Sequence, residues 1–174
     1  MIYNMLNKNS SEDTLRSLGL MTLGSRLKRL GERLQAEVQP ILSELAPPVA
    51  AGQHPLLAAL SKHGALTVGE LAALLGVAQP GITRAVGQLA GIGLVAVTTA
   101  AEDGRRRLVS LSPDGVAFVA AAREGVWLRV EKAVADLCAG FGDELLAHIG
   151  SIEDGLARKP LTARAVEERQ DDLA

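Results

Sequence analysis

The sequence predicts a mainly α-helical protein that carries a small β-hairpin. Apolar residues make up 48% of its 174 residues but aromatic residues only 2%, so the core must be aliphatic. Leu and Ala favour helices, whereas β-branched residues cluster in only a few short stretches. A third observation is a periodic spacing of leucines near the N-terminus, which is typical of an amphipathic helix.

This periodic segment runs from about Glu12 to Leu45, behind a leader at 1–11 that we expect to be disordered. Its apolar residues recur every three or four positions and so form one stripe along a helix. The stripe consists of Leu20, Leu23, Leu27, Leu30, Leu34, Val38, Ile41 and Leu45. So long a stripe needs a second helix to cover it. The same chain could supply that helix, but a second copy is favoured, with residues 12–53 as the N-terminal dimerisation helix and linker.

A stretch rich in proline and glycine, residues 46–54, separates this helix from a short apolar helix at 55–62. The next residues have the form of a capping box, in which the Thr67 hydroxyl accepts from the Glu70 amide while the Glu70 side chain reaches back. We expect this box to start a helix over 68–75.

Gly76 ends that helix, because glycine readily takes the left-handed conformation. A second helix begins near Gln79, with Pro80 in its first turn, where the missing N–H does no harm. It ends near Gly91 or Gly93. The residues expected to face inward are Ile82, Val86 and Leu89.

The pattern then changes to extended structure. The runs 94–99 and 107–111 are rich in β-branched residues and are joined by a charged segment. They predict a two-stranded hairpin with a charged tip.

Ser112, with a proline and an aspartate after it, predicts the start of a long helix that ends near Ala139. A last helix is expected over 143–157. We expect residues 113–160 to form the C-terminal dimerisation helices and residues 161–174 to form a charged tail.

A helix, a glycine-containing turn, a second helix and a β-hairpin are the layout of a winged helix-turn-helix, which we assign to residues 54–112. The second helix of such a motif fits the major groove of double-stranded DNA, where Gln can pair with adenine and Arg with guanine or a phosphate. Arginines at the hairpin tip can reach a minor groove or nearby phosphates. The expected DNA-contacting residues are Gln79, Thr83, Arg84, Gln88, Arg105, Arg106 and Arg107.

The net charge of −2 argues by itself against a nucleic-acid binder, but its distribution does not. Residues 54–112 contain five basic and three acidic residues, whereas residues 113–174 contain seven basic and twelve acidic ones. The predicted DNA-binding segment is therefore the more positive part.

The helix-turn-helix segment resembles the MarR family of bacterial transcription regulators; its sequence is LTVGELAALLGVAQPGITRAVGQLAGIGLV, followed by EDGRRRLVSLSPDG. The resemblance is most specific at Gln79-Pro80 and at Asp103-x-Arg105. It implies that Pro80 belongs to the DNA-binding surface and that Arg105, braced by Asp103, enters the minor groove. It also implies interlocking N- and C-terminal helices in a homodimer, and a small aromatic or phenolic acid effector bound between head and dimer base.

This sequence departs from the family pattern at several positions. Ala78 stands where Ser or Thr usually caps the recognition helix, and Gly81 removes a possible phosphate contact. Gly87 and Gly91 each weaken the helix by up to ~1 kcal/mol relative to Ala. The first wing strand lacks the usual basic residues, so weaker DNA binding is expected.

Other classes of function find little support. Cys138 is the only cysteine, which excludes an internal disulfide, and we expect it to be a buried structural thiol. The three histidines have no metal-ligand spacing, and no catalytic motif is present, so we expect no metal, no cofactor and no enzyme activity. Trp127 is interpreted as core or dimer packing. With no apolar run of about 18 residues, a soluble cytoplasmic protein is expected.

Two hypotheses therefore remain. The first is a homodimeric, repressor-like regulator that binds a pseudo-palindromic operator and is released by an effector. The alternative is a protein-interaction module of the same fold whose DNA binding is weak or lost.

Overall fold

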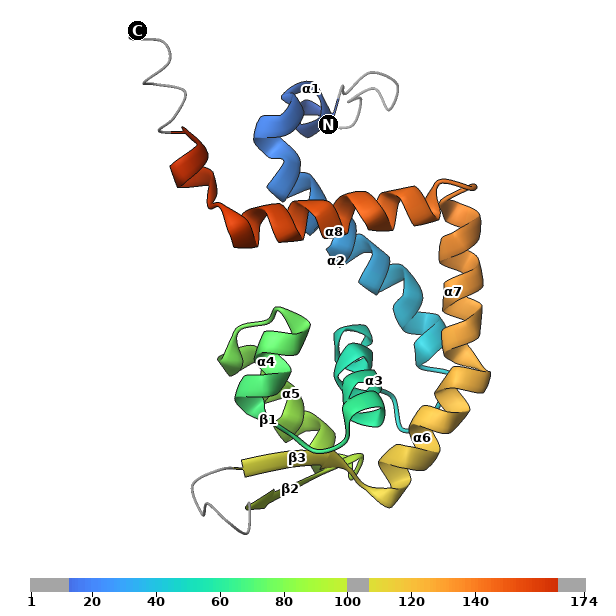
Figure 1. The fold of residues 1–174 in the computed structure, drawn as a ribbon. Coiled ribbons are helices and arrows are strands. Elements are labelled where there is room, and N and C mark those ends of the chain that lie inside the picture. The colour runs from blue at the N-terminus through green and yellow to red at the C-terminus, as the bar shows by residue number, and fades with distance from the viewer. Residues whose placement is uncertain (1–12, 100–106, 166–174) are drawn as a thin grey trace, which may run out of the picture. The chain divides into compact units, whose positions relative to one another are not determined.

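A computed structural model describes residues 13–99 and 107–165 of the chain. The chain divides into two compact units, residues 1–130 and residues 131–174. Helices account for most of the described residues, and a small three-stranded sheet lies in the first unit (Figure 1). The predicted fold class is therefore confirmed, while the expected leader at 1–11 lies outside the described residues.

The N-terminal segment forms three pieces and not the single helix that was predicted. They are α1 (Thr14–Ser17), the 3-10 helix η1 (Gly19–Thr22) and α2 (Leu23–Leu42). Gly19 has a φ of 61°, a left-handed conformation that glycine adopts without steric cost. The chain turns at this residue, so that the leucine periodicity continues across a break in the helix.

The apolar stripe of α2 is covered at its C-terminal end only. The stripe residues that are buried in the core or pack against it there are Val38, Ile41 and Leu45 together with their neighbour Leu42. Towards the N-terminus, Leu20, Leu27 and Leu30 are 86%, 41% and 49% exposed. This part of the stripe remains available to another helix.

The head that follows contains short helices and the sheet. Its elements are η2 (Ala51–Gln53), α3 (His54–His63), β1 (Leu66–Thr67), α4 (Val68–Leu75), α5 (Gln79–Gly91), β2 (Val95–Thr99) and β3 (Arg107–Leu111). The strand order is β1-β3-β2, both pairings are antiparallel, and Val109 lies opposite Leu66 on one side and Val97 on the other. The predicted hairpin is present, but β1 was missed because two residues are too few to show a period-2 pattern.

An aliphatic core holds the head together, as the composition predicted. Its most deeply buried side chains come from the connection before η2, from three helices and from the sheet region, and they are Val49, Leu56, Leu57, Leu71, Leu89, Leu94 and Val109. These residues fix the orientation of α4 and α5 against the sheet.

The long helix predicted after the wing is divided. Ser112 caps α6 (Pro113–Glu124) by accepting a 2.9 Å hydrogen bond from the Gly115 amide, as expected. Gly125, with φ −117° and ψ −96°, then interrupts the helix before α7 (Val126–Leu137). The predicted helix continued to about Ala139, but the backbone of Gly125 lies outside the helical range.

The second unit contains the end of α7 and the helix α8 (Gly142–Arg158). The expected break between them is present, with Ala139 and Gly140 at positive φ. Residues 161–165 are again helical. None of the described helices combines the length and apolar character needed to cross a membrane.

Candidate DNA-binding surface

The helix-turn-helix begins with the predicted capping box. The Glu70 amide donates a 3.2 Å hydrogen bond to Thr67 Oγ1, and the Thr67 amide donates a 2.7 Å bond to Glu70 Oε2. Together these bonds satisfy two amides at the start of α4. Gly76 ends α4 with a φ of 63°, so the turn to α5 has the predicted geometry.

Helix α5 has one buried and one exposed face. Ile82, Val86 and Leu89 are 3%, 6% and 0% exposed and anchor it in the core, as predicted. The predicted contact residues Gln79, Pro80, Thr83, Arg84 and Gln88 are all exposed. The structure thus brings the predicted major-groove residues together on one helix that is held rigidly from behind.

Two side chains on this face already make hydrogen bonds within the chain. The Thr83 hydroxyl donates to the Gln79 carbonyl oxygen at 3.0 Å, and Gln53 Nε2 donates to Gln88 Oε1. Sequence reasoning missed Gln53, because no local pattern pairs residues that are 35 positions apart. Gln88 keeps its amide donors and a second lone pair for another partner.

The positions that depart from the family pattern have visible consequences. Ala78 has the extended backbone of an N-cap, but no side-chain hydrogen bond caps α5. A Cβ atom at Gly81 would lie 3.2 Å from Val77 Cγ1, so a larger residue there would crowd the turn. At Gly87 and Gly91 a Cβ would meet nothing within 4 Å. Gly81, Gly87 and Gly91 therefore leave three exposed positions of α5 without a side chain. 

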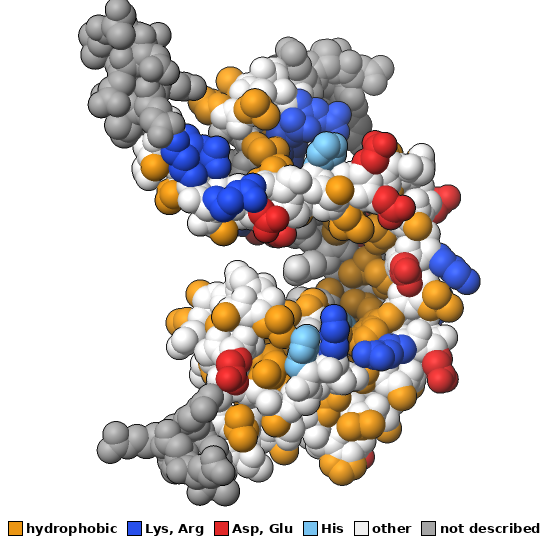
Figure 2. All heavy atoms as spheres, viewed as in Figure 1, with side chains coloured by type: hydrophobic (Ala, Val, Ile, Leu, Met, Phe, Trp, Pro, Cys, Tyr) orange, Lys and Arg blue, Asp and Glu red, His pale blue; other side chains and the backbone are white. Residues whose placement is uncertain are grey.

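The wing is described only in part. Arg107 lies at the start of β3 opposite Thr99 and is exposed. The predicted wing residues Asp103, Arg105 and Arg106 lie outside the described residues. In the view of Figure 2, few charged side chains lie over α4, in line with the sparse charge of the head.

Other predicted residues lie elsewhere. Trp127 is half-buried and donates a hydrogen bond to His54 within the same chain, so its expected dimer contact remains a prediction. Cys138 is half-buried, not fully buried, just after α7. Among residues 13–99 and 107–165, no cluster of His, Cys, Asp and Glu could hold a metal ion.

The α4–turn–α5 unit and its β2–β3 wing define a winged helix-turn-helix protein. Residues 47–106 match the family model described as MarR family. This match agrees with the resemblance found in the sequence.

A curated relative is also a helix-turn-helix regulator. An HTH-type transcriptional regulator of Mycobacterium tuberculosis is 41% identical over 76 residues, which are 44% of this chain and 53% of the relative. The chain thus spans about half the length of the curated relatives it matches. By their names these relatives are transcriptional regulators.

Solved structures of two regulators have the same fold. The transcriptional repressor CouR bound to a DNA duplex is 26% identical, with a TM-score of 0.66 over 75% of this chain and 92% of CouR. BpsR of Bordetella bronchiseptica is 22% identical, with a TM-score of 0.63 over 79% of this chain and 94% of BpsR. Its structure concerns the regulation of DNA binding by 6-hydroxynicotinic acid.

Proposed function

We propose that this chain is a sequence-specific DNA-binding transcriptional regulator that works in the cytoplasm. The observation that carries the proposal is the exposed face of α5, which presents Gln79, Thr83 and Arg84 while its opposite face is locked in the core. Amide and guanidinium groups on such a helix can read base edges in the major groove. The DNA-bound structure of CouR, which shares this fold, supports the proposal.

The regulator is further proposed to act as a homodimeric repressor on a pseudo-palindromic operator. Exposed apolar residues of η1 and α2, and separately those of the segment from the end of α7 through α8, support a dimer, because exposed apolar surface of this kind marks an interaction site. They include Leu20, Leu27, Leu30, Leu137, Phe141, Leu145, Leu146, Ile152 and Leu156. In such a dimer the two recognition helices enter successive major grooves about 34 Å apart.

A small aromatic or phenolic acid is proposed as the effector that releases DNA. BpsR, whose DNA binding is regulated by 6-hydroxynicotinic acid, supports an effector of this class. The effector acts by binding one arrangement of the two heads more tightly than the other.

Fluorescence anisotropy against a library of genomic fragments tests DNA binding, at low salt and at physiological salt. The double variant Arg84→Ala with Arg105→Ala is expected to lose most of the affinity, whereas Lys132→Ala, an exposed cation on α7, is the matched control. If no fragment is preferred over random DNA, the proposal is wrong.

The exposed glycines of α5 favour one alternative, a protein-interaction module of the same fold. The absent cap at Ala78 and the glycines at Gly87 and Gly91 leave fewer groups for DNA than the family pattern has. The double variant Arg84→Ala with Arg105→Ala distinguishes the two. If it folds normally and retains full activity in the cell, the DNA-binding proposal is wrong and the protein-interaction module is favoured.

A further inference from the structure

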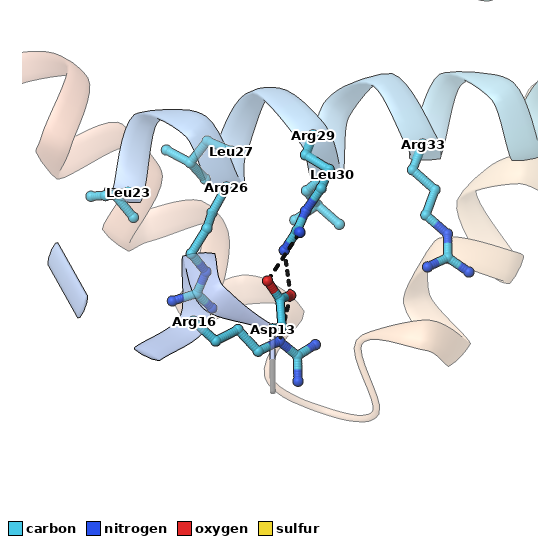
Figure 3. Close-up of a pocket in the computed structure, with 8 residues that line it drawn as sticks. All are labelled: Asp13, Arg16, Leu23, Arg26, Leu27, Arg29, Leu30 and Arg33. Atoms are coloured by element: carbon cyan, nitrogen blue, oxygen red, sulfur yellow. Dashed lines mark hydrogen bonds and ion pairs between the residues drawn. The ribbon is translucent and has the colours of Figure 1, made fainter. Parts of the chain in front are cut away.

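The two halves of α2 make different polar contacts. In the N-terminal half, Arg29 donates hydrogen bonds of 3.1 and 2.6 Å to Asp13, so these bonds stay within the N-terminal segment (Figure 3). In the C-terminal half, Gln39 Nε2 donates a 3.1 Å bond to the Val49 carbonyl oxygen, and Gln39 Oε1 accepts a 2.7 Å bond from the Ala51 amide. Gln39 thus fixes the connection that leads from α2 to α3.

Gln53 is the last residue of this connection, and its backbone is held on both sides. Its amide donates a 2.8 Å hydrogen bond to the Ala50 carbonyl oxygen, which closes the turn of η2. The next residue, His54, is buried and accepts a hydrogen bond from Trp127. The half-buried side chain of Gln53 therefore starts from a fixed position, which lowers the entropy cost of holding a partner.

The partner of Gln53 is Gln88, on the exposed face of α5. Gln53 Nε2 donates a hydrogen bond to Gln88 Oε1. Gln88 lies four residues after Arg84, so both side chains leave the same face of the helix, opposite the buried Val86. In the described part of the chain, no residue accepts a hydrogen bond from Gln88 Nε2. The amide of Gln88 is therefore held by its oxygen, while both of its N–H donors are free.

We propose that Gln53 is a positioning residue for DNA reading, which holds the amide of Gln88 with its N–H donors toward the DNA. This inference rests on the DNA binding proposed above. An amide in this orientation selects a base that offers acceptors at the groove edge, such as O6 and N7 of guanine or O4 of thymine. Without Gln53 the amide can turn over, because its oxygen and nitrogen ends are nearly equal in size, and it then fits a base with an amino donor equally well. Gln53 thus contributes to base choice through Gln88. 

The test uses the full chain and a duplex that the wild type selects from a random-sequence library, together with every single-base-pair variant of that duplex. Fluorescence anisotropy at one salt concentration gives the ratio of dissociation constants between duplexes. Gln88→Ala identifies the base pair that Gln88 reads, at which the preference should fall about 3- to 10-fold because one hydrogen bond is lost. Gln53→Ala should lower the preference at the same base pair and at no other.

Two charged variants of Gln53 test the orientation of the amide. Lys can only donate, so Gln53→Lys should keep the wild-type base preference. A carboxylate can only accept, so Gln53→Glu should turn the amide of Gln88 and move the preference toward a base with an amino donor, adenine or cytosine. The added charge acts alike on duplexes that differ in one base pair, so it does not alter the ratio. In the Gln88→Ala background, neither variant should change any ratio.

Gln35→Ala is the matched control, because Gln35 lies beside the same turn. A Cβ atom at Gly52 would be 3.4 Å from Gln35 Oε1, whereas no hydrogen bond joins Gln35 to α5 in the described part of the chain. This variant should keep every ratio, and circular dichroism should show the same helix content in all variants.

Three results would overturn the role of Gln53 and leave the proposed function intact, since the wild type would still select its duplex. They are an unchanged preference in Gln53→Ala, the same shift in Gln53→Lys and Gln53→Glu, and an equal loss of affinity for all duplexes in Gln88→Ala. The last result would place Gln88 on a phosphate, which carries no sequence information. A wild type that selects no duplex would overturn both proposals.

Discussion

The indole Nε1–H of Trp127 donates a 2.8 Å hydrogen bond to Nδ1 of His54, and so joins α7 to the first residue of α3. His54 is 6% exposed and also packs against Phe118. Because Nδ1 accepts, the neutral imidazole carries its proton on Nε2, which is buried and makes no hydrogen bond of normal geometry with any residue in the described part of the chain. This arrangement therefore favours the neutral form of His54.

This pairing predicts a loss of stability in acid. Burial lowers the pKa of His54 below its ordinary value of 6.5, because the charged ring would be desolvated. A smaller interaction with the Val49 backbone raises the pKa but does not offset the effect of burial. A lowered pKa means that the neutral ring stabilises the fold above pH 6.5, and that this contribution is lost as the pH falls through 6.5 towards the lowered value. Urea unfolding at pH 8 and pH 5, followed by the fluorescence of Trp127, measures it.

His54→Gln is the control for that measurement, since the amide oxygen of Gln can still accept a hydrogen bond and does not titrate. The variant should lose less stability between the two pH values than the wild type. His63 and His148 are exposed and remain in both proteins. Equal pH dependence in the two proteins would show that His54 does not carry the effect.

Much of this fold could be predicted because its signals are local. The capping box at Thr67, the proline at the start of α5 and the cap at Ser112 each involve residues within one turn of a helix. The pairs Gln53–Gln88 and His54–Trp127 join residues 35 and 73 positions apart, and no local pattern contains them. The sequence therefore predicted which residues form the exposed DNA-binding surface. It did not predict the long-range contacts within the head.

Glycines show a second limit of local patterns. The breaks at Gly19 and Gly125 lie in sequences whose apolar periodicity continues through them. A glycine inside a helical pattern is either tolerated or a break, and tertiary packing decides between the two. Sequence alone could not distinguish these positions from Gly87, which lies inside α5.

Gly115→Ala is expected to destabilise the head strongly. A Cβ atom there would lie 1.9 Å from the carbonyl oxygen of Leu94, so the start of α6 would have to move away from the wing. Overpacking of this kind costs about 1–3 kcal/mol, or more where backbone is the obstacle. Chemical denaturation measures the change in the free energy of unfolding. A loss below ~0.5 kcal/mol would contradict the close approach.

Gly87→Ala is the matched control and should have the opposite sign. A Cβ at Gly87 meets nothing within 4 Å, and the residue lies inside α5. Alanine there is expected to raise the free energy of unfolding by up to ~1 kcal/mol, because it restricts the unfolded chain and favours the helix. The same denaturation series compares the two variants directly.

Ala78→Ser is expected to stabilise the recognition helix. Ala78 already has the extended backbone of an N-cap, with φ −60° and ψ 139°, but offers no side-chain acceptor. A serine hydroxyl there can accept from an amide in the first turn, which contributes ~1 kcal/mol. Hydrogen exchange of the α5 amides should slow. Ala78→Val, which cannot accept, should leave exchange unchanged or faster, and an equal slowing by both variants would exclude capping as the cause.

The proposed dimer can be tested at one residue from each dimerisation segment. Leu20 and Leu146 are 86% and 68% exposed in a single chain. If a second copy buries both, each contributes about 1.5–3 kcal/mol, so Leu20→Asp with Leu146→Asp should raise the dimer dissociation constant at least ~100-fold. Analytical ultracentrifugation measures that constant.

Leu74→Asp with Val116→Asp is the control for the dimer test. Both residues are exposed and apolar, at 49% and 57%, but they lie on α4 and α6 of the head. This variant should keep the wild-type dissociation constant, because its new charges stay in water. If both double variants weaken association equally, the effect comes from added negative charge and not from the leucine stripe. A wild-type chain that sediments as a monomer at all concentrations would remove the homodimer from the proposed function.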